Sequence, residues 1–396
     1  MGKIEQKTIK FINEHMEIFV FLMVSILGAV VRYCLRRYIS GDMNSFLLPW
    51  YEEMKGQGLR SLSRQIGNYN IMYQFLIALM TYLPVNPMVG YKVLSILFDY
   101  LLAGIAAILV YQLTNQSKSK AILAYACILM SPLVYLNSAC WGQCDGIYVT
   151  FLMLAVLALF REKYNWMMVA IGIAFVFKLQ AVFLLPFFLL IYYVKQKFSI
   201  LKFLIIPLSM VLSGLPGVIA GRSVFDVFRI YLNQTSEYTK IQMNYPSAWC
   251  ILVNSGLEGG EVYYSVKYAA ILMTICILML LYYYWIRKRV QMTECNMLYI
   301  AFLTCYTCVL FLPSMHERYG YMYEVLAILI AFINKKSRVL LAGLLSISII
   351  IYGNYLFGLG QPINQLFGYV NLSIYLAYLF LLNKNMINKL EVQQKV

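Results

Sequence analysis

Apolar residues fill most of this chain in long runs, and short polar stretches separate the runs. A helix that crosses the hydrocarbon core of a bilayer needs about 20 consecutive, mainly apolar residues. The runs therefore predict an all-α polytopic membrane protein with about 12 transmembrane helices, within a range of about 10 to 13. The expected spans are residues 16–35, 90–112, 120–137, 145–160, 164–178, 180–194, 199–220, 263–286, 297–312, 319–334, 338–353 and 366–383.

Composition supports this class. Hydrophobic residues make up 62% of the chain and charged residues only 12%, with a mean hydropathy of +0.70, whereas soluble domains carry about 25% charged residues. A soluble domain with a single anchor is excluded. The formal charge of +15 does not indicate nucleic-acid binding, because the basic residues lie in short groups between apolar runs, as topology signals do.

Basic residues also predict the orientation. With the N-terminus in the cytoplasm, every inner segment carries Lys or Arg, which is the positive-inside pattern. Twelve spans then place both termini in the cytoplasm, and we expect an integral membrane protein. The long outer segments are residues 36–89 and 221–262, and the whole chain, 1–396, is expected to form one transmembrane domain.

Two segments complicate the count. The apolar stretch 69–83 could be a thirteenth span, but this would invert all later segments. It is better interpreted as an amphipathic helix in the outer interface, ended by Pro84 and Pro87. Residues 164–194 are short for two passes, so we expect a tight hairpin with Lys178 and Gln180 near its apex.

The first polar group is an acidic turn, Gly41-Asp42-Met43-Asn44, directly after the first expected span. Five arginines flank it, although outer loops are normally poor in basic residues. A lipid phosphate would explain them, because a guanidinium fork matches phosphate geometry. The alternative is that they pair with Glu52, Glu53 and surface phospholipids. The five are Arg32, Arg36, Arg37, Arg60 and Arg64.

The second polar group, residues 137–145, joins two expected spans on the outer side. Asp145 opens a helix, where the helix dipole favours a carboxylate, and this structural role is one interpretation. The other is that Trp141, Gln143 and Asp145 line a polar cavity, with the Trp141 ring as a platform for the face of a sugar.

The third polar group is His316, Glu317 and Arg318 at the boundary of an expected span. Such residues are costly in a membrane unless they face a cavity or each other, so a structural salt-bridge cluster is the alternative to a functional site. His316 is not expected to bind a metal, because no second His accompanies it at metal-ligand spacing. Tyr245 and Trp249, in Tyr-Pro-Ser-Ala-Trp, give a weaker signal, whose alternative is an ordinary Pro-aromatic turn.

All of these groups fall on one side of a topology that was chosen from basic loops alone. Their shared side predicts a single active site at the outer surface.

Together these motifs resemble those of the GT-C glycosyltransferases. They are the acidic turn, the interfacial helix after it, Trp-Gly-Gln-x-Asp, Lys-x-Gln at 178–180, Tyr-Pro-x-x-Trp and Met-His-Glu-Arg-Tyr. The resemblance covers about residues 20–330. It is strongest to the bacterial mannosyltransferases related to the GPI-anchor second mannosyltransferase. The His-Glu-Arg stretch is also similar to the His-Glu-Lys stretch of dolichyl-phosphate-glucose glucosyltransferases.

The resemblance implies transfer of a hexose, mannose or glucose, from a polyprenyl-phosphate donor to an acceptor on the extracytoplasmic side, with inversion. Asp42 matches the family's acidic residue and would be the general base. The leaving phosphate needs cations, and His316 would bind the phosphate or the sugar. Expected donor-phosphate ligands are Arg318, His316, Lys178, Arg36 and Arg37. Expected substrate-binding residues are Glu317, which would also hold Arg318, with Asp145, Trp141, Gln143, Gln180, Tyr245 and Trp249.

No cofactor is expected. Some GT-C members bind a divalent metal through acidic clusters, but the chain lacks an Asp-x-Asp or Asp-Glu pair at Asp42, although Asp145 leaves room for one. Because no soluble outer domain is visible, a lipid-linked or envelope glycan is a more suitable acceptor than a folded protein. Membrane lipids are the other expected partners.

Two other functions fit part of the pattern. A transporter or flippase of a lipid-linked sugar would share the arginine-rich outer loop, but it favours charges distributed along a path to the inside, and paired halves with broken helices. Charged residues here gather at the outer ends instead. An envelope polymer ligase or polymerase would use a diphosphate-linked donor.

Overall fold

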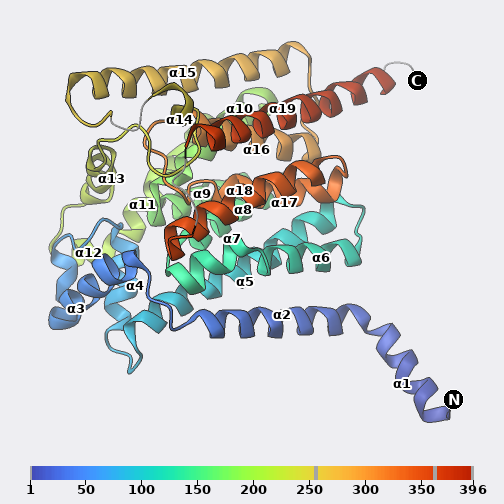
Figure 1. Ribbon diagram of the computed structural model, residues 1–396, viewed down its shortest axis with the longest axis horizontal. Helices are drawn as coiled ribbons and strands as arrows, with labels where there is room; N and C mark the ends of the chain where they lie inside the picture. The colour runs from blue at the N-terminus through green and yellow to red at the C-terminus, as the bar shows by residue number, and fades with distance from the viewer. Residues whose placement is uncertain (1, 254–256, 360–363, 394–396) are drawn as a thin grey trace.

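A computed structural model describes residues 2–253, 257–359 and 364–393, which are almost entirely helical (Figure 1). The long helices run along the long axis of the molecule, and the described residues form only two isolated β-bridges and no strand. The α-helices are α1 (Lys3–Glu14), α2 (Met16–Leu35), α3 (Leu48–Gln57), α4 (Ile71–Met80), α5 (Pro87–Leu113), α6 (Lys118–Leu129), α7 (Pro132–Tyr135), α8 (Asp145–Phe160), α9 (Tyr164–Phe177), α10 (Leu185–Lys195), α11 (Ile205–Ser213), α12 (Leu215–Ile219), α13 (Asp226–Glu237), α14 (Trp249–Leu252), α15 (Gly260–Arg287), α16 (Glu294–Phe311), α17 (Tyr321–Ile333), α18 (Ser337–Phe357) and α19 (Gln365–Gln393).

Short segments with other hydrogen-bond periods lie where long helices bend or meet. Two are π-helical and three are 3₁₀-helical. They are η1 (Met43–Leu47) and η3 (Leu136–Trp141), which are π-helical, and η2 (Gly58–Ser63), η4 (Leu179–Leu184) and η5 (Ile200–Leu204). Single π-helical turns are frequent at functional sites, and η1 and η3 adjoin the first two polar groups.

Each of the twelve expected spans coincides with a helical segment, so the prediction of an all-helical membrane protein is confirmed. Among the described residues, six helices are long and apolar enough to cross a bilayer. The expected span 120–137 is a helix pair bent by 44°, and the other five are apolar helices of 10–17 residues. The count of about twelve full spans stays a prediction. The six long helices are α2, α5, α15, α16, α18 and α19.

Several short helices stop at the polar groups. α8 begins at Asp145, α9 ends just before Lys178, and α17 begins shortly after Arg318. At 1.5 Å per residue, the 16 residues of α8 extend about 24 Å, less than the roughly 30 Å of a hydrocarbon core. These helices are short because their ends carry the site, which is therefore recessed into the bundle.

The segment expected in the outer interface is α4. Its ten residues end before Pro84, and Ile71, Tyr73 and Ile77 are buried against the bundle. A ten-residue helix extends only about 15 Å, so α4 cannot be a thirteenth span.

The core and the periphery differ as expected for a membrane bundle. α16 and α17 are largely buried, whereas α15 and α19 expose apolar side chains such as Leu272 and Phe380. Both ends of the described chain lie at the same end of the bundle, at the right in Figure 1. The helices of the long outer segments, α3, α4, α12 and α13, lie at the opposite end.

Candidate active site

Asp42 lies at the end of the bundle that carries α3, α4 and α13. Its turn is fixed by Ser40, whose hydroxyl donates to the carbonyl of Trp141 at 2.8 Å and accepts the backbone N–H of Met43 at 3.1 Å. The chain after the first long helix is thereby attached to η3, the segment that begins the second polar group.

The Asp42 carboxylate accepts three hydrogen bonds. Oδ2 accepts Nε1–H of Trp141 at 2.9 Å and Nε2–H of Gln143 at 2.7 Å, and Oδ1 accepts the hydroxyl of Tyr355 at 2.7 Å. The rings of Trp141 and Tyr355 stack with centroids 4.5 Å apart. Three donors hold the half-buried carboxylate in one orientation.

A tight turn directs both Trp141 and Gln143 to Asp42. Gly142 has a φ of 80°, in the left-handed region that favours glycine. A Cβ at this position would lie 2.4 Å from the Met43 side chain. Glycine is therefore needed both for the backbone conformation and for the close approach to the turn that carries Asp42.

Gln143 connects Asp42 to a buried ion pair. Its Oε1 accepts the hydroxyl of Tyr69 at 2.9 Å and lies 3.4 Å from the ammonium of Lys178. Lys178 forms an ion pair with Asp145 at 2.7 Å, and both side chains are buried. Lys178 lies in the break between α9 and η4, and its ammonium points into the site. The expected tight hairpin over residues 164–194 stays a prediction.

Asp145 joins the second polar group to the third. Besides Lys178, its carboxylate accepts Nδ2–H of Asn137 at 2.8 Å and lies 3.5 Å from Nε of Arg318. Asp145 does not line the pocket beside these cations. The residue opens α8, but its carboxylate binds cations of other segments rather than capping the helix.

Arg318 lies between two carboxylates and an aromatic face. Its Nη1 lies 3.4 Å from Glu317, and its guanidinium lies 5.5 Å from the ring centroid of Trp141. Burial alone would lower the pKa of Arg318, but Asp145 and Glu317 raise that pKa well above its usual range. Arg318 thus stays charged in this buried position.

Three buried polar atoms in this loop have no hydrogen-bond partner among the described residues. They are Nε2 of His316, Oε2 of Glu317 and Nε of Arg318. The other ring nitrogen of His316 lies 3.8 Å from Glu317, and the imidazole packs edge-on against Tyr238 at 4.4 Å. Unsatisfied buried polar atoms are uncommon in folded proteins, and a cluster of them indicates a place for a ligand.

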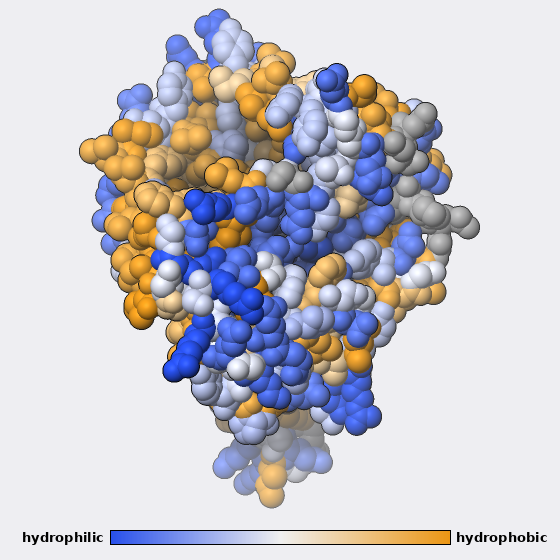
Figure 2. Space-filling model, turned by 90° about the vertical axis from the view of Figure 1, so that its left-hand side faces the viewer, coloured by the Kyte–Doolittle hydropathy of each residue, from blue (hydrophilic) through white to orange (hydrophobic). Residues whose placement is uncertain are grey.

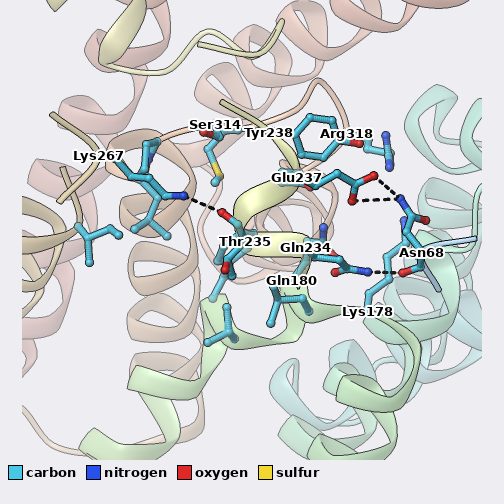
Figure 3. A pocket seen from close by; sticks show the side chains of 18 of the residues that line it. Asn68, Lys178, Gln180, Gln234, Thr235, Glu237, Tyr238, Lys267, Ser314 and Arg318 are labelled. Carbon is cyan, nitrogen blue, oxygen red and sulfur yellow. Dashed lines mark hydrogen bonds between the residues drawn. The ribbon is translucent and has the colours of Figure 1, made fainter. Parts of the chain in front are cut away.

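A pocket of about 250 Å³ opens beside these cations (Figure 3). Arg318 and Lys178 lie on one side of it, near Asn68, and Lys267 lies on the opposite side. Its outer wall is α13, which is tied to Asn68 by a hydrogen bond to Glu237 at 3.2 Å. Polar lining residues include Tyr69, Gln180 and Tyr238. Apolar lining residues include Phe177, Leu179, Val182, Phe183, Ile271 and Leu312.

The surface at this end of the bundle has the same polarity pattern. In Figure 2, hydrophilic side chains gather around a hollow in the middle of the face, and hydrophobic side chains lie along much of its edge.

The sequence of this region matches a known family. Residues 68–313, more than half of the chain, match the family model of glycosyltransferase family 87. The chain belongs to glycosyltransferase family 87. No curated protein matched the chain.

Membership of family 87 confirms that the protein is a transferase enzyme of the glycosyltransferase class with membrane helices. The matched region includes Gln143, Asp145 and Lys178. The narrower resemblance to the bacterial mannosyltransferase group stays a prediction.

In this family 87 protein, some expected site residues lie elsewhere. Arg36 folds back on its own helix, where its guanidinium donates to the carbonyl of Tyr33 and stacks on that ring at 3.4 Å. Arg37 is exposed, and neither arginine lines the pocket. The buried ammonium of Lys92 donates to the carbonyl groups of Leu35 and Arg36 at the end of this helix and of Tyr38 just beyond it.

Tyr245 and Trp249 also lie apart from the pocket. The Tyr245 hydroxyl is buried in hydrogen bonds with Tyr323 and Asn371, and Trp249 Nε1–H donates to the carbonyl of Phe311 at 2.8 Å. These contacts attach the second long outer segment to the bundle.

Sequence reasoning missed several tyrosines of the site. Tyr355 and Tyr69 bind Asp42 and Gln143, and Tyr238 packs on His316. With 34 tyrosines in the chain, no sequence signal distinguishes these three. Their hydroxyl groups or rings reach the site only through the packing of α18, α4 and the end of α13.

We expect the substitution Tyr355→Phe to lower sugar transfer about tenfold. A hydrogen bond to a charged group contributes about 1.5–3 kcal/mol, and the substitution removes one of the three that orient the Asp42 carboxylate. Initial rates of the purified protein would measure the effect. Tyr369→Phe on the exposed side of α19 is the matched control, and an equal loss in both variants would contradict a specific role for Tyr355.

Proposed function

We propose that this family 87 transferase moves a hexose, mannose or glucose, from a polyprenyl-phosphate donor to a lipid-linked or envelope glycan, with inversion at the anomeric carbon. The supporting observation is that one network of contacts joins an oriented carboxylate, Asp42, to two buried cations, Lys178 and Arg318. The two cations line the pocket, and Asp42 lies outside its lining. Gln143 connects the carboxylate to the cations, because its amide binds Asp42 on one side and faces Lys178 on the other.

Asp42 is the proposed general base. A carboxylate has about four lone-pair positions, and Trp141, Gln143 and Tyr355 occupy three of them. The remaining position on Oδ1 can accept the proton of the acceptor hydroxyl as its oxygen attacks the anomeric carbon. The bond between that carbon and the phosphate oxygen breaks, and the phosphate leaves with the electron pair.

Arg318 and Lys178 are proposed to stabilise the leaving phosphate. Of the five N–H donors of Arg318, only one makes a hydrogen bond among the described residues, so others are available to phosphate oxygens. Glu317 and Asp145 hold the cations in place. His316 is proposed to donate from its unpartnered Nε2, and Gln180, which lines the pocket, is proposed to contact the sugar. Trp141 and Gln143 were expected to contact the sugar as well, but both are buried outside the pocket lining and bind Asp42 instead.

The polyprenyl chain is proposed to leave the pocket along its apolar side, past Val182, Phe183 and Ile271. Val182 is 37% exposed, so this side of the pocket reaches the surface of the bundle. The donor head group would then lie beside Arg318 while the lipid stays in the bilayer.

We also propose that no resident metal takes part. Among the described residues, no group of three or more His, Cys, Asp or Glu could hold a metal ion. Asp145 is already paired with Lys178 and Arg318, and Asp42 accepts three neutral donors. Carboxylates with these partners do not form the oxygen cage that Mg²⁺ or Ca²⁺ requires.

The orientation follows from the basic segments. Both termini are proposed to be cytoplasmic and the end of the bundle that carries Asp42 extracytoplasmic, in a bacterial plasma membrane, with residues 1–396 as one domain. A flippase remains less suited to the site, because a carboxylate base beside phosphate-binding cations serves chemistry rather than passage.

The direct test is donor consumption by the purified protein in a buffer that contains EDTA. We expect polyprenyl-phosphate mannose or polyprenyl-phosphate glucose to be consumed, and the corresponding polyprenyl-diphosphate sugar to be left intact. Consumption of the diphosphate donor alone would contradict the proposed leaving group and favour a polymer ligase or polymerase. Loss of activity that Mg²⁺ restores would contradict catalysis without a metal.

A further inference from the structure

A second pocket lies between α8 and α9 at the end of the bundle opposite the candidate active site. Its volume is about 380 Å³. Asp145 begins α8 and Arg161 follows its last residue, so about 24 Å of helix separates this pocket's rim from the site. Its lining is almost entirely apolar and includes Phe151, Leu154, Leu157, Val169, Ala170 and Ile173.

Two cations flank this apolar pocket. Arg161 and Lys163 belong to its lining, both are exposed, and neither side chain has an ion-pair or hydrogen-bond partner in the described parts of the chain. The acidic residue between them does not neutralise them, because Glu162 pairs with Lys195 at 3.6 Å. The rim of the pocket therefore carries two uncompensated positive charges.

An exposed tryptophan marks the same rim. Trp166, in the first turn of α9, lines the pocket and is 69% exposed. Tryptophan is enriched where a membrane protein meets the lipid head groups, and basic side chains reach to the same level. The pocket therefore opens at the depth where a head group ends and its acyl chain begins.

We propose that this pocket binds an anionic phospholipid. One acyl chain would fill the apolar space between α8 and α9, and the phosphate would lie between Arg161 and Lys163. Basic pockets between transmembrane helices bind anionic head groups in this manner. A sugar does not suit the pocket, because its lining offers almost no hydrogen-bonding groups apart from the two cations at the rim.

The experiment measures binding of phosphatidylglycerol and phosphatidylcholine to the purified full-length protein by native mass spectrometry. We expect phosphatidylglycerol to bind about 30-fold more tightly, at roughly fivefold for each basic residue near an anionic lipid. The variant Arg161→Ala/Lys163→Ala should lose this preference. Both positions are exposed, and its unfolding midpoint without lipid should match that of the unmodified protein.

Matched variants test the site rather than charge in general. Lys335→Ala/Lys336→Ala removes two exposed charges from another turn at the same end of the bundle, and it should keep the preference. Ala158→Trp fills the pocket and should weaken the binding of phosphatidylglycerol at least tenfold, because the acyl chain can no longer bury its CH₂ groups there. Equal losses in the two double variants would overturn the proposal, as would unchanged binding in the filled variant or equal competition by soluble glycerol phosphate.

Discussion

Asp42→Asn should lower sugar transfer about 1000-fold, within the 10²–10⁴ range of general acid–base catalysis, while the protein stays folded. Asparagine keeps the size of the side chain, and its carbonyl oxygen can still accept from Trp141 and Gln143. The hydroxyl of Tyr355, which donates to Asp42 in the native site, can turn to accept from the new amide. What the variant loses is the ability to take a proton from the acceptor hydroxyl.

The measurement is single-turnover transfer from the polyprenyl-phosphate sugar that the native protein consumes. Glu52→Gln is the matched control, because Glu52 is an exposed acid of the same outer segment, and it should transfer at the native rate. Donor binding by Asp42→Asn should be nearly unchanged, since the cations lie on the other side of Gln143. A rate close to native would remove Asp42 as the base and leave the family assignment untouched.

The sequence could predict the helical segments and the meeting of the three polar groups. Apolar runs mark helices because every backbone group in a bilayer must be hydrogen-bonded internally. Sidedness brought Asp42, Asp145 and Arg318 to one end, and Trp141 and Gln143 do connect them. The location of the helices and the side on which each polar group lies depend on the hydropathy and charge of the sequence, which one chain is enough to show.

The partners of individual side chains could not be predicted. The sequence pattern groups Arg32 with the arginines that flank Asp42, but Arg32 is buried at the end of α2 against Asp99 of α5. A signal existed, because a carboxylate within an apolar span needs a buried partner. Arg36 gave no such signal. An arginine near the lipid phosphates can bind them, but it can also stack on a neighbouring ring, as Arg36 does on Tyr33.

The recessed position of the site explains why the helical segments could be predicted from the sequence and the partners of individual side chains could not. α8 begins at Asp145, α9 ends just before Lys178 and α17 begins at Tyr321, and all three helices are short. Their polar ends therefore lie deeper in the bundle than a loop at the membrane surface would. Side chains at that depth must be paired within the protein. The result is a dense set of contacts whose members come from distant parts of the chain.

The buried pair of Arg32 and Asp99 is expected to have the largest effect on stability. The two side chains meet at 2.8 Å and are 2% and 1% exposed. Arg32 also donates to the carbonyl groups of Gly28 and Leu129. We expect Asp99→Leu to lower the free energy of unfolding by about 3–5 kcal/mol, because it leaves a buried guanidinium without its anion. Thermal unfolding in detergent would measure this loss.

Two variants distinguish the stability lost by leaving a buried charge unpaired from the stability lost through poorer packing. Arg32→Met/Asp99→Leu removes both charges and should regain most of the stability, since apolar replacement of a complete buried pair is often neutral. Arg64→Ala breaks an exposed ion pair with Glu53 and should cost less than about 1 kcal/mol. A double variant as unstable as Asp99→Leu would show that packing, not charge, explains the loss.

The same pair should matter for the reaction. Ser138 of η3 donates to Asp99 at 2.5 Å, and the same π-helical segment carries Asn137, which binds Asp145, and Trp141, which binds Asp42. Asp99 therefore holds the segment that joins the proposed base to the buried cations. The charge-free double variant should regain stability but not full transfer, because Ser138 then loses its bond to α5 and keeps only the local acceptor of Val134 at 3.2 Å, so that η3 is less firmly placed.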